Sequence, residues 1–295
     1  MDADHFDAMT RLFARAVSRR GLMGAAAALT AVAAAPAGLR SAAAQSDAGA
    51  LVQQYYETID AYQYQDAYAL LGAKWRSQQS LSNLTNGYAD TAFVQCQIAG
   101  QEPAANGVTV HVKLLAWHND GTIVAYQGRY LVGTEGGQQR ILSGGNTLVA
   151  TPAGTPPLCK LADLSFSFGR WNGATGSVAG VVTGTNTSQA TCALGGSPRL
   201  RLTGGNNQRI DSTSIPGAPP EAVIVAPDAT ANAMIRFSNY CAADLTDPLT
   251  VQIDIPGDPS HTVIRPPAAA IAYPRCDQSA SPARFAVLGW TSGSS

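Results

Sequence analysis

The sequence predicts two domains: an α+β domain with helices packed on an antiparallel sheet, then an all-β sandwich. Apolar residues recur at helical spacing between residues 48 and 88, and four runs with strand-like alternation follow them. After residue 157, short apolar runs are separated by Gly, Pro and Asn, without any helical pattern. A chain of 295 residues is long enough for two such domains.

Residues 1–44 have the pattern of a twin-arginine (Tat) export signal. Arg19 and Arg20 follow a serine and precede a run of mostly Ala and Gly that ends near Leu39. The small residues Ala42–Ala44 then form an A-x-A cleavage site, which would leave Gln45 as the new N-terminus. We therefore expect the Tat translocase and signal peptidase as partners during export, and a secreted or extracytoplasmic protein that could be held at the cell surface.

An uncleaved N-terminal anchor helix is the alternative to a cleaved signal. The run is poor in Leu, Ile and Phe and is interrupted by Pro36, which disfavours a membrane span. Once residues 1–44 are removed, we expect no stable span, and 14 basic and 17 acidic residues remain. A net charge of −3 gives no electrostatic reason to bind nucleic acid.

The first domain is expected to contain three helices followed by a four-stranded meander. Asp120-Gly121 supplies a tight turn between the second and third strands. The expected helices cover residues 48–62, 65–74 and 80–91, and the expected strands cover 91–100, 107–117, 121–133 and 138–146. Helices followed by such a meander pack on one face of a curved antiparallel sheet.

Three segments of this region, "YYETIDAYQYQDAYALLGAKW", "GYADT" and "YQGRYLV", resemble the cone of the nuclear transport factor 2-like superfamily. The resemblance covers residues 48 to about 148, within a domain expected at 48–150. It implies an α+β cone, in which enzymes of the superfamily use an interior Asp, His or Tyr as a general base or oxyanion donor. The residues that could take these roles here are Asp60, Asp66, His111 and Tyr126. The superfamily also includes many domains without known chemistry.

A structural role is the favoured interpretation of these candidates. His111 alternates with Val110 and Val112, so its side chain faces away from theirs, and Asp66 is placed to cap a helix. A His–Asp pair at a recognisable spacing is missing from the sequence. Cys96 is expected to be a buried, unreactive thiol, because neither Lys nor Arg lies within fifteen residues of it.

Residues 151–157 are rich in Pro and Gly and are interpreted as a linker to a sandwich at 158–293. The eight expected strands lie within residues 162–169, 177–186, 199–204, 221–227, 231–239, 249–257, 261–266 and 283–290. Neither a C-x-x-C pair nor a phosphate-binding loop occurs, so we expect neither a metal nor a cofactor.

Four cysteines in this half of an exported chain predict two disulfides. In an immunoglobulin-like sandwich the first and last strands can run side by side. That arrangement would pair Cys159 with Cys276, and it would leave Cys192 to pair with Cys241, one of three possible connectivities.

The same half resembles an exported bacterial family known as domain of unknown function 4232. The resemblance rests on "CKLADLSFSFGRWNGATGSVAGVVTGTNTS", "CALGGSPRLRL", "RFSNYC" and the late Cys276, and it covers residues 158 to about 290. It implies a fold and an extracytoplasmic setting, without an established activity.

The function expected from these observations is non-catalytic: a secreted or cell-surface protein that binds a small apolar ligand or an envelope component. The alternative is a cone-domain isomerase, dehydratase or lyase that acts on a small apolar substrate through His111 or Asp60. A purely structural role in the envelope is a third possibility. An open apolar cavity with His111 or Asp60 pointing into it would favour the enzyme, and a filled cone would disfavour it.

Overall fold

The computed structural model describes residues 37–174, 177–214, 221–238, 247–267 and 284–293. Arg19, Arg20, Cys241 and Cys276 lie outside these residues. The chain divides into two compact units, Met1–Ala44 and Gln45–Ser295, so the boundary falls at the bond where signal cleavage is predicted.

Four α-helices occur in the described part of the chain, where three were predicted for the first domain. They are α2 (Ala37–Asp60), α3 (Tyr64–Ala69), α4 (Ala73–Gln78) and α5 (Leu81–Gly87). The single helix predicted for residues 65–74 is wrong, because the chain is held to the sheet at Leu71 and Gly72. Leu71 forms a bridge with Ile141, and the Gly72 N–H donates to the Ile141 carbonyl. Within the described residues, no helix has both the length and the apolar character of a membrane span.

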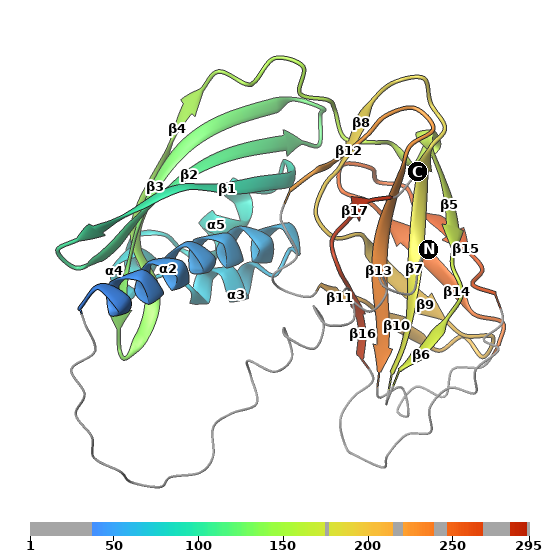
Figure 1. Cartoon of the computed structure of the whole chain (residues 1–295), viewed down its shortest axis with the longest axis horizontal. Helices are drawn as coiled ribbons and strands as arrows, with labels where there is room; N and C mark the ends of the chain where they lie inside the picture. Colours follow the sequence, from blue (N-terminus) through green and yellow to red (C-terminus); the bar gives the residue numbers. More distant parts are fainter. Residues whose placement is uncertain (1–36, 175–176, 215–220, 239–246, 268–283, 294–295) are drawn as a thin grey trace, which may run out of the picture. The chain divides into compact units, whose positions relative to one another are not determined.

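The predicted meander is confirmed as a four-stranded antiparallel sheet in the order β1-β2-β3-β4. Its strands are β1 (Thr91–Ala104), β2 (Gly107–His118), β3 (Ile123–Glu135) and β4 (Gln138–Val149). The helices lie against one face of this sheet (Figure 1). We call that face the inner face, and it carries Val94, Cys96, Val112, Leu114 and Tyr130. Side chains alternate along a strand, so the residues between them point to the opposite, open face.

In the described residues after 157, the regular secondary structure is β-strand apart from one short 3-10 helix. The main strands are β5 (Leu164–Phe168), β7 (Ser177–Asn186), β9 (Arg199–Thr203), β13 (Thr230–Ser238), β14 (Thr250–Asp254) and β16 (Arg284–Val287). Shorter elements are η1 (Leu161–Asp163), β6 (Asn172–Ala174), β8 (Cys192–Leu194), β10 (Arg209–Asp211), β11 (Thr213–Ser214), β12 (Val223–Val225), β15 (Thr262–Ile264) and β17 (Thr291–Ser292). Each of the eight predicted runs overlaps one of these strands.

Two larger sheets form this part, in the orders β10-β9-β14-β15 and β11-β16-β13-β7-β5, beside a small β12-β8 pair. Apolar residues on alternate positions of the strands form one buried cluster, which includes Val182, Leu202, Ile235, Val251 and Phe285. This pattern is that of strands with one face in a core and the other toward water. The paired strands β7 and β13 run side by side in the larger of these sheets (Figure 1).

A third, smaller apolar cluster contains residues from both halves of the second unit. Phe93 and Trp117 come from the open face at one end of the β1-β2-β3-β4 sheet, and Leu158 and Ala193 come from the chain after the linker. The rings of Phe93 and Trp117 are 5.5 Å apart between centroids. One end of the open face is therefore buried by the second half of the chain.

Candidate functional site

The inner face holds a group of tyrosines rather than a lone catalytic residue. Tyr55 and Tyr56 come from α2, Tyr88 follows α5, and Tyr130 comes from β3. Tyr56 and Tyr130 are 0% and 3% exposed, which places both phenols in the core. Burial raises the pKa of each of these four hydroxyls above its ordinary value, so all are neutral at physiological pH.

Two of these tyrosines, Tyr56 and Tyr130, form a closed ring of hydrogen bonds with Asn146 of β4. The Tyr130 hydroxyl donates to Oδ1 of Asn146 at 2.8 Å, so its only proton is used there. The 2.5 Å contact between the hydroxyls of Tyr56 and Tyr130 must then have Tyr56 as its donor. Nδ2 of Asn146 donates back to the Tyr56 hydroxyl at 3.2 Å. Each group is both donor and acceptor, which is how a buried polar cluster avoids an unpaired atom.

Asp60, a predicted candidate base, lies at the C-terminal end of α2 beside this tyrosine group. Its Oδ1 accepts a hydrogen bond of 2.8 Å from the Val94 N–H, which fastens the helix to β1. Burial raises the pKa of this carboxyl well above its usual value; the Val94 hydrogen bond partly opposes that shift, and Glu57 adds to it. A carboxyl with a raised pKa is a feature of general acids and bases, and it also occurs at structural sites.

Cys96 is a buried free cysteine, as the sequence predicted. Burial is the main cause that raises the pKa of its thiol to about 12, and the nearby acidic groups of Asp60 and Glu57 raise it further. The thiolate is the reactive form of cysteine, so this side chain is protonated and inert at neutral pH.

His111 lies on the open face, away from the tyrosines. Its Nε2 is 3.1 Å from Oε1 of Glu102, and the same carboxylate oxygen is 3.5 Å from Arg129. The alternation with Val110 and Val112 therefore predicted its orientation correctly. The structure does not bring His111 together with Asp60, because they are on opposite faces of the sheet.

The other two predicted candidates, Asp66 and Tyr126, lie at positions that do not indicate a catalytic role. Asp66 lies in the first turn of α3, and the residue at the N-cap position is Gln63, so the predicted capping role is wrong. Tyr126 is partly buried and packs at the edge of the inner-face core. Among the described residues, no group of three or more His, Cys, Asp or Glu could hold a metal ion.

An open pocket of about 290 Å³ lies on the open face of the sheet, next to the buried end of that face. Its polar residues are Gln95, Gln97, Lys113 and Gln127. Apolar residues of the same strands and of the chain just after β4 complete the lining: Leu114, Leu115, Ala125, Tyr126, Val149, Ala150 and Pro152. Side chains from neighbouring strands thus converge on a concave site that was not predicted.

Two signals in the sequence point to this face. "QCQ" in β1 places two glutamines on one side of the strand, because side chains two positions apart share a face. In β2, "KLLAW" loses the alternation of the preceding residues, and Leu115 and Trp117 are apolar on the open side. Loss of alternation is typical of a strand that is covered on both faces.

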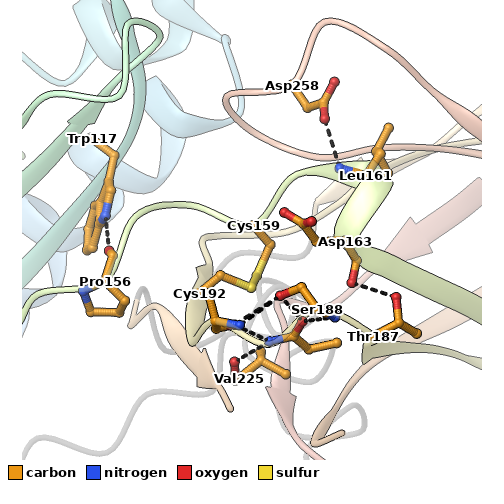
Figure 2. Close-up of a disulfide and its surroundings, with 12 residues drawn as sticks. Trp117, Pro156, Cys159, Leu161, Asp163, Thr187, Ser188, Cys192, Val225 and Asp258 are labelled. Atoms are coloured by element: carbon orange, nitrogen blue, oxygen red, sulfur yellow. Dashed lines mark hydrogen bonds between the residues drawn. A yellow bond between two sulfur atoms is a disulfide. The ribbon is translucent and has the colours of Figure 1, made fainter. Parts of the chain in front are cut away.

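The second notable site is the disulfide between Cys159 and Cys192, shown in Figure 2. The predicted pairs Cys159–Cys276 and Cys192–Cys241 are therefore wrong. The prediction assumed that the first and last strands are neighbours, but β5 pairs with β7, whereas β16 lies between β11 and β13. A bridge between Leu158 and Ala193 instead brings the start of this half beside β8.

Hydrogen bonds hold both sides of this disulfide. The Cys159 N–H donates to the Ala193 carbonyl, and the Ala193 N–H donates to the Pro157 carbonyl, both within 2.9 Å. The indole of Trp117 donates to the Pro156 carbonyl at 3.0 Å (Figure 2). The end of the predicted linker thus forms hydrogen bonds with both β8 and β2.

Asn186 organises the loop that leads to Cys192. Its Nδ2 donates to the carbonyls of Ala190 and Val225, and its Oδ1 accepts from the backbone and hydroxyl of Ser188. The side chain is fully buried. Both N–H donors and the carbonyl oxygen of this amide bond within the fold, so the Asn186 side chain of the sequence "NTS" (residues 186–188) has a structural role.

No curated protein and no solved structure matches the chain. One family model matches it, over the part that contains the disulfide and both larger sheets. Residues 159–285 match the family described as Domain of unknown function (DUF4232), which confirms the resemblance stated for the C-terminal half and makes this part of the chain similar to that family.

Proposed function

We propose that the protein is an exported, non-catalytic binding protein, with a nuclear transport factor 2-like domain at residues 48–150 and a disulfide-bonded immunoglobulin-like sandwich at 158–293. The pocket on the open face of the β1-β2-β3-β4 sheet carries this proposal. Its glutamine and lysine side chains face solvent, whereas the phenols of the inner face bond to one another and to Asn146. A ligand can reach the first set without disrupting the core.

The proposed location outside the cytoplasm rests on the twin arginines and on the Cys159–Cys192 disulfide. Disulfides persist in oxidising compartments and are rare in the cytosol. The unit boundary between Ala44 and Gln45 is also where signal removal is proposed, although α2 continues across it. Cleavage there would require the first turns of this helix to be unfolded in the precursor.

A cone-domain isomerase, dehydratase or lyase is the second candidate, because Asp60 has a raised pKa beside a group of phenols. In such an enzyme Asp60 would move the proton, and a phenol would stabilise the oxyanion. His111 does not enter this scheme, because it lies on the other face. Ligand bound against Asp60, in protein purified from its own host, would favour this candidate over the first.

Two experiments test the first proposal. Changing Arg19 and Arg20 together to Lys should leave the precursor in the cytoplasm, because the translocase recognises the arginine pair; mature protein outside such cells would contradict export by this route. A crystal structure of protein purified from its own host should show ligand density in the open-face pocket. Density only beside Asp60 would contradict the pocket as the binding site.

A further inference from the structure

The open-face pocket has an ordered arrangement of polar groups. In the register of the sheet, Gln97 lies opposite Lys113, and Lys113 lies opposite Gln127, so one ammonium group stands between two amides in a single row. Directly opposed residues have Cβ atoms about 5 Å apart, which places the three side-chain heads within reach of one small ligand.

The next row supplies the apolar part. Leu115 lies opposite Ala125, and Ala125 lies opposite Val149. Pro152, just after β4, also lines the pocket. Ala125 is 5% exposed and forms the floor, so an aliphatic group of methyl or isopropyl size can rest there.

The pocket carries one uncompensated positive charge. Of the residues that line it, none is acidic, and Lys113 is exposed without an ion pair among the described residues. Glu102, further along the same face, is already paired with His111 and Arg129. A ligand that brings a carboxylate to Lys113 therefore supplies the missing charge.

The glutamines specify what should lie beside that carboxylate. A side-chain amide offers two N–H donors and a carbonyl acceptor, which match the carbonyl and N–H of a peptide bond. Gln95 already accepts a hydrogen bond from the Ala222 N–H through Oε1, so its NH₂ group remains for a ligand. A carboxylate, an amide and a small aliphatic group occur together at the carboxyl end of a peptide.

We propose that the open-face pocket binds the carboxyl-terminal end of a short peptide with small aliphatic side chains. The terminal carboxylate pairs with Lys113, the last peptide bond lies between Gln97 and Gln127, and the aliphatic side chains rest on Leu115 and Ala125. This assignment rests on the proposed binding function and adds the class of ligand. A volume of about 290 Å³ is at the lower limit of ligand pockets, which suits one or two small residues.

The test is an NMR titration of the ¹⁵N-labelled protein, purified from a host that exports it. The probes are N-acetyl-alanyl-alanine and its carboxyl-terminal amide, each at millimolar concentration, because so few contacts support only weak binding. We expect the free acid to shift the backbone signals of Lys113, Gln127 and Ala150. The amide should bind at least about 10-fold more weakly than the free acid.

Two substitutions and a matched control complete the test. Lys113→Met keeps an unbranched side chain of similar bulk but removes its charge, and it should weaken binding of the free acid by about 10-fold or more. Gln127→Glu places a carboxylate opposite Lys113 and should also weaken binding of the free acid. Lys74→Met changes an exposed lysine on α4, away from the pocket, and should leave binding unchanged.

The inference is overturned if the free acid shifts none of these signals, if acid and amide bind equally, or if Lys113→Met binds as well as the parent. Failure of the proposed function is a separate result, since it would appear as mature protein outside cells that carry Lys at positions 19 and 20, or as ligand density only beside Asp60. A different ligand seated in the pocket of host-purified protein would retain the binding function and reject the peptide.

Discussion

Gly195 packs with its backbone against the ring of Phe93, closely enough that a Cβ atom at position 195 would lie 2.4 Å from Cδ1 of that ring. Phe93 lies in β1, before the predicted linker, and Gly195 directly follows β8, after that linker. Together with the hydrogen bond from Trp117 to Pro156, this contact joins the β1-β2-β3-β4 sheet to the chain after residue 157.

Changing Gly195 to Ala should therefore destabilise the whole protein. The added methyl group has no space beside Phe93, and overpacking of this kind costs about 1 to 3 kcal/mol. Urea unfolding followed by tryptophan fluorescence measures the loss. Gly87→Ala is the matched control, because nothing lies within 4 Å of a Cβ there, and it should be neutral or stabilising. Equal stabilities of the two variants would contradict the close approach.

Peptide mapping without reduction should recover Cys159 and Cys192 in one linked peptide. The even number of cysteines in this half then predicts a Cys241–Cys276 pair. Cys241 lies shortly after Ser238, Cys276 lies shortly before Arg284, and Ser238 pairs with Arg284 in the sheet. A peptide that links Cys192 to Cys241 would contradict the structure.

Removal of the Cys159–Cys192 bridge should lower the free energy of unfolding. The bridged residues are 33 positions apart, and for such a loop the chain-entropy estimate is about 3 to 4 kcal/mol. The double variant Cys159→Ala, Cys192→Ala should show this loss in urea unfolding. Cys96→Ala is the comparison variant, because it removes a cysteine and leaves both disulfide cysteines intact. An unchanged midpoint for the double variant would show that the hydrogen bonds around Pro157 and Ala193 suffice without it.

Asp60 should make stability depend on pH in the direction opposite to an ion-paired carboxylate. Its pKa in the folded protein is raised above the ordinary value of 3.8, so folding favours the protonated form. Its contribution is fully present below pH 3.8 and is lost as the pH rises through the folded-state pKa. Asp60→Asn should therefore stabilise the protein at pH 7 and make little difference at pH 3.

The measurement is chemical unfolding of the parent and of Asp60→Asn across this pH range. The exposed Asp66 provides a control, because Asp66→Asn should change stability by no more than about 0.5 kcal/mol at any pH. A constant difference between the parent and Asp60→Asn at all pH values would contradict the raised pKa.

The ring formed by Tyr56, Tyr130 and Asn146 should behave as a coupled unit. Tyr130→Phe removes the donor to Asn146 and the acceptor for Tyr56, and should destabilise the protein by about 1 to 3 kcal/mol. Tyr56→Phe should cost less in the Tyr130→Phe background than alone, which a double-mutant cycle measures. Tyr126→Phe is the control, because Tyr126 is only partly buried; additive effects at positions 56 and 130 would argue against the ring.

The strands and the orientation of single side chains could be predicted from the sequence by itself. Alternation along β2 placed His111 opposite Val110 and Val112, and punctuation by Gly, Pro and Asn located the strands after residue 157. These features depend on neighbours one or two positions away, because the period of a strand is two residues. The burial of Cys96 follows from the same local pattern.

Only the tertiary structure decided which distant residues meet. Cys159 pairs with Cys192 because the bridge between Leu158 and Ala193 brings the start of this half beside β8, and the tyrosine ring joins residues 74 and 90 positions apart. The open-face pocket depends on the register of three strands and on the path of the chain after β4. The order of strands in a sheet is selected by the packing of the whole core, and no local periodicity records it.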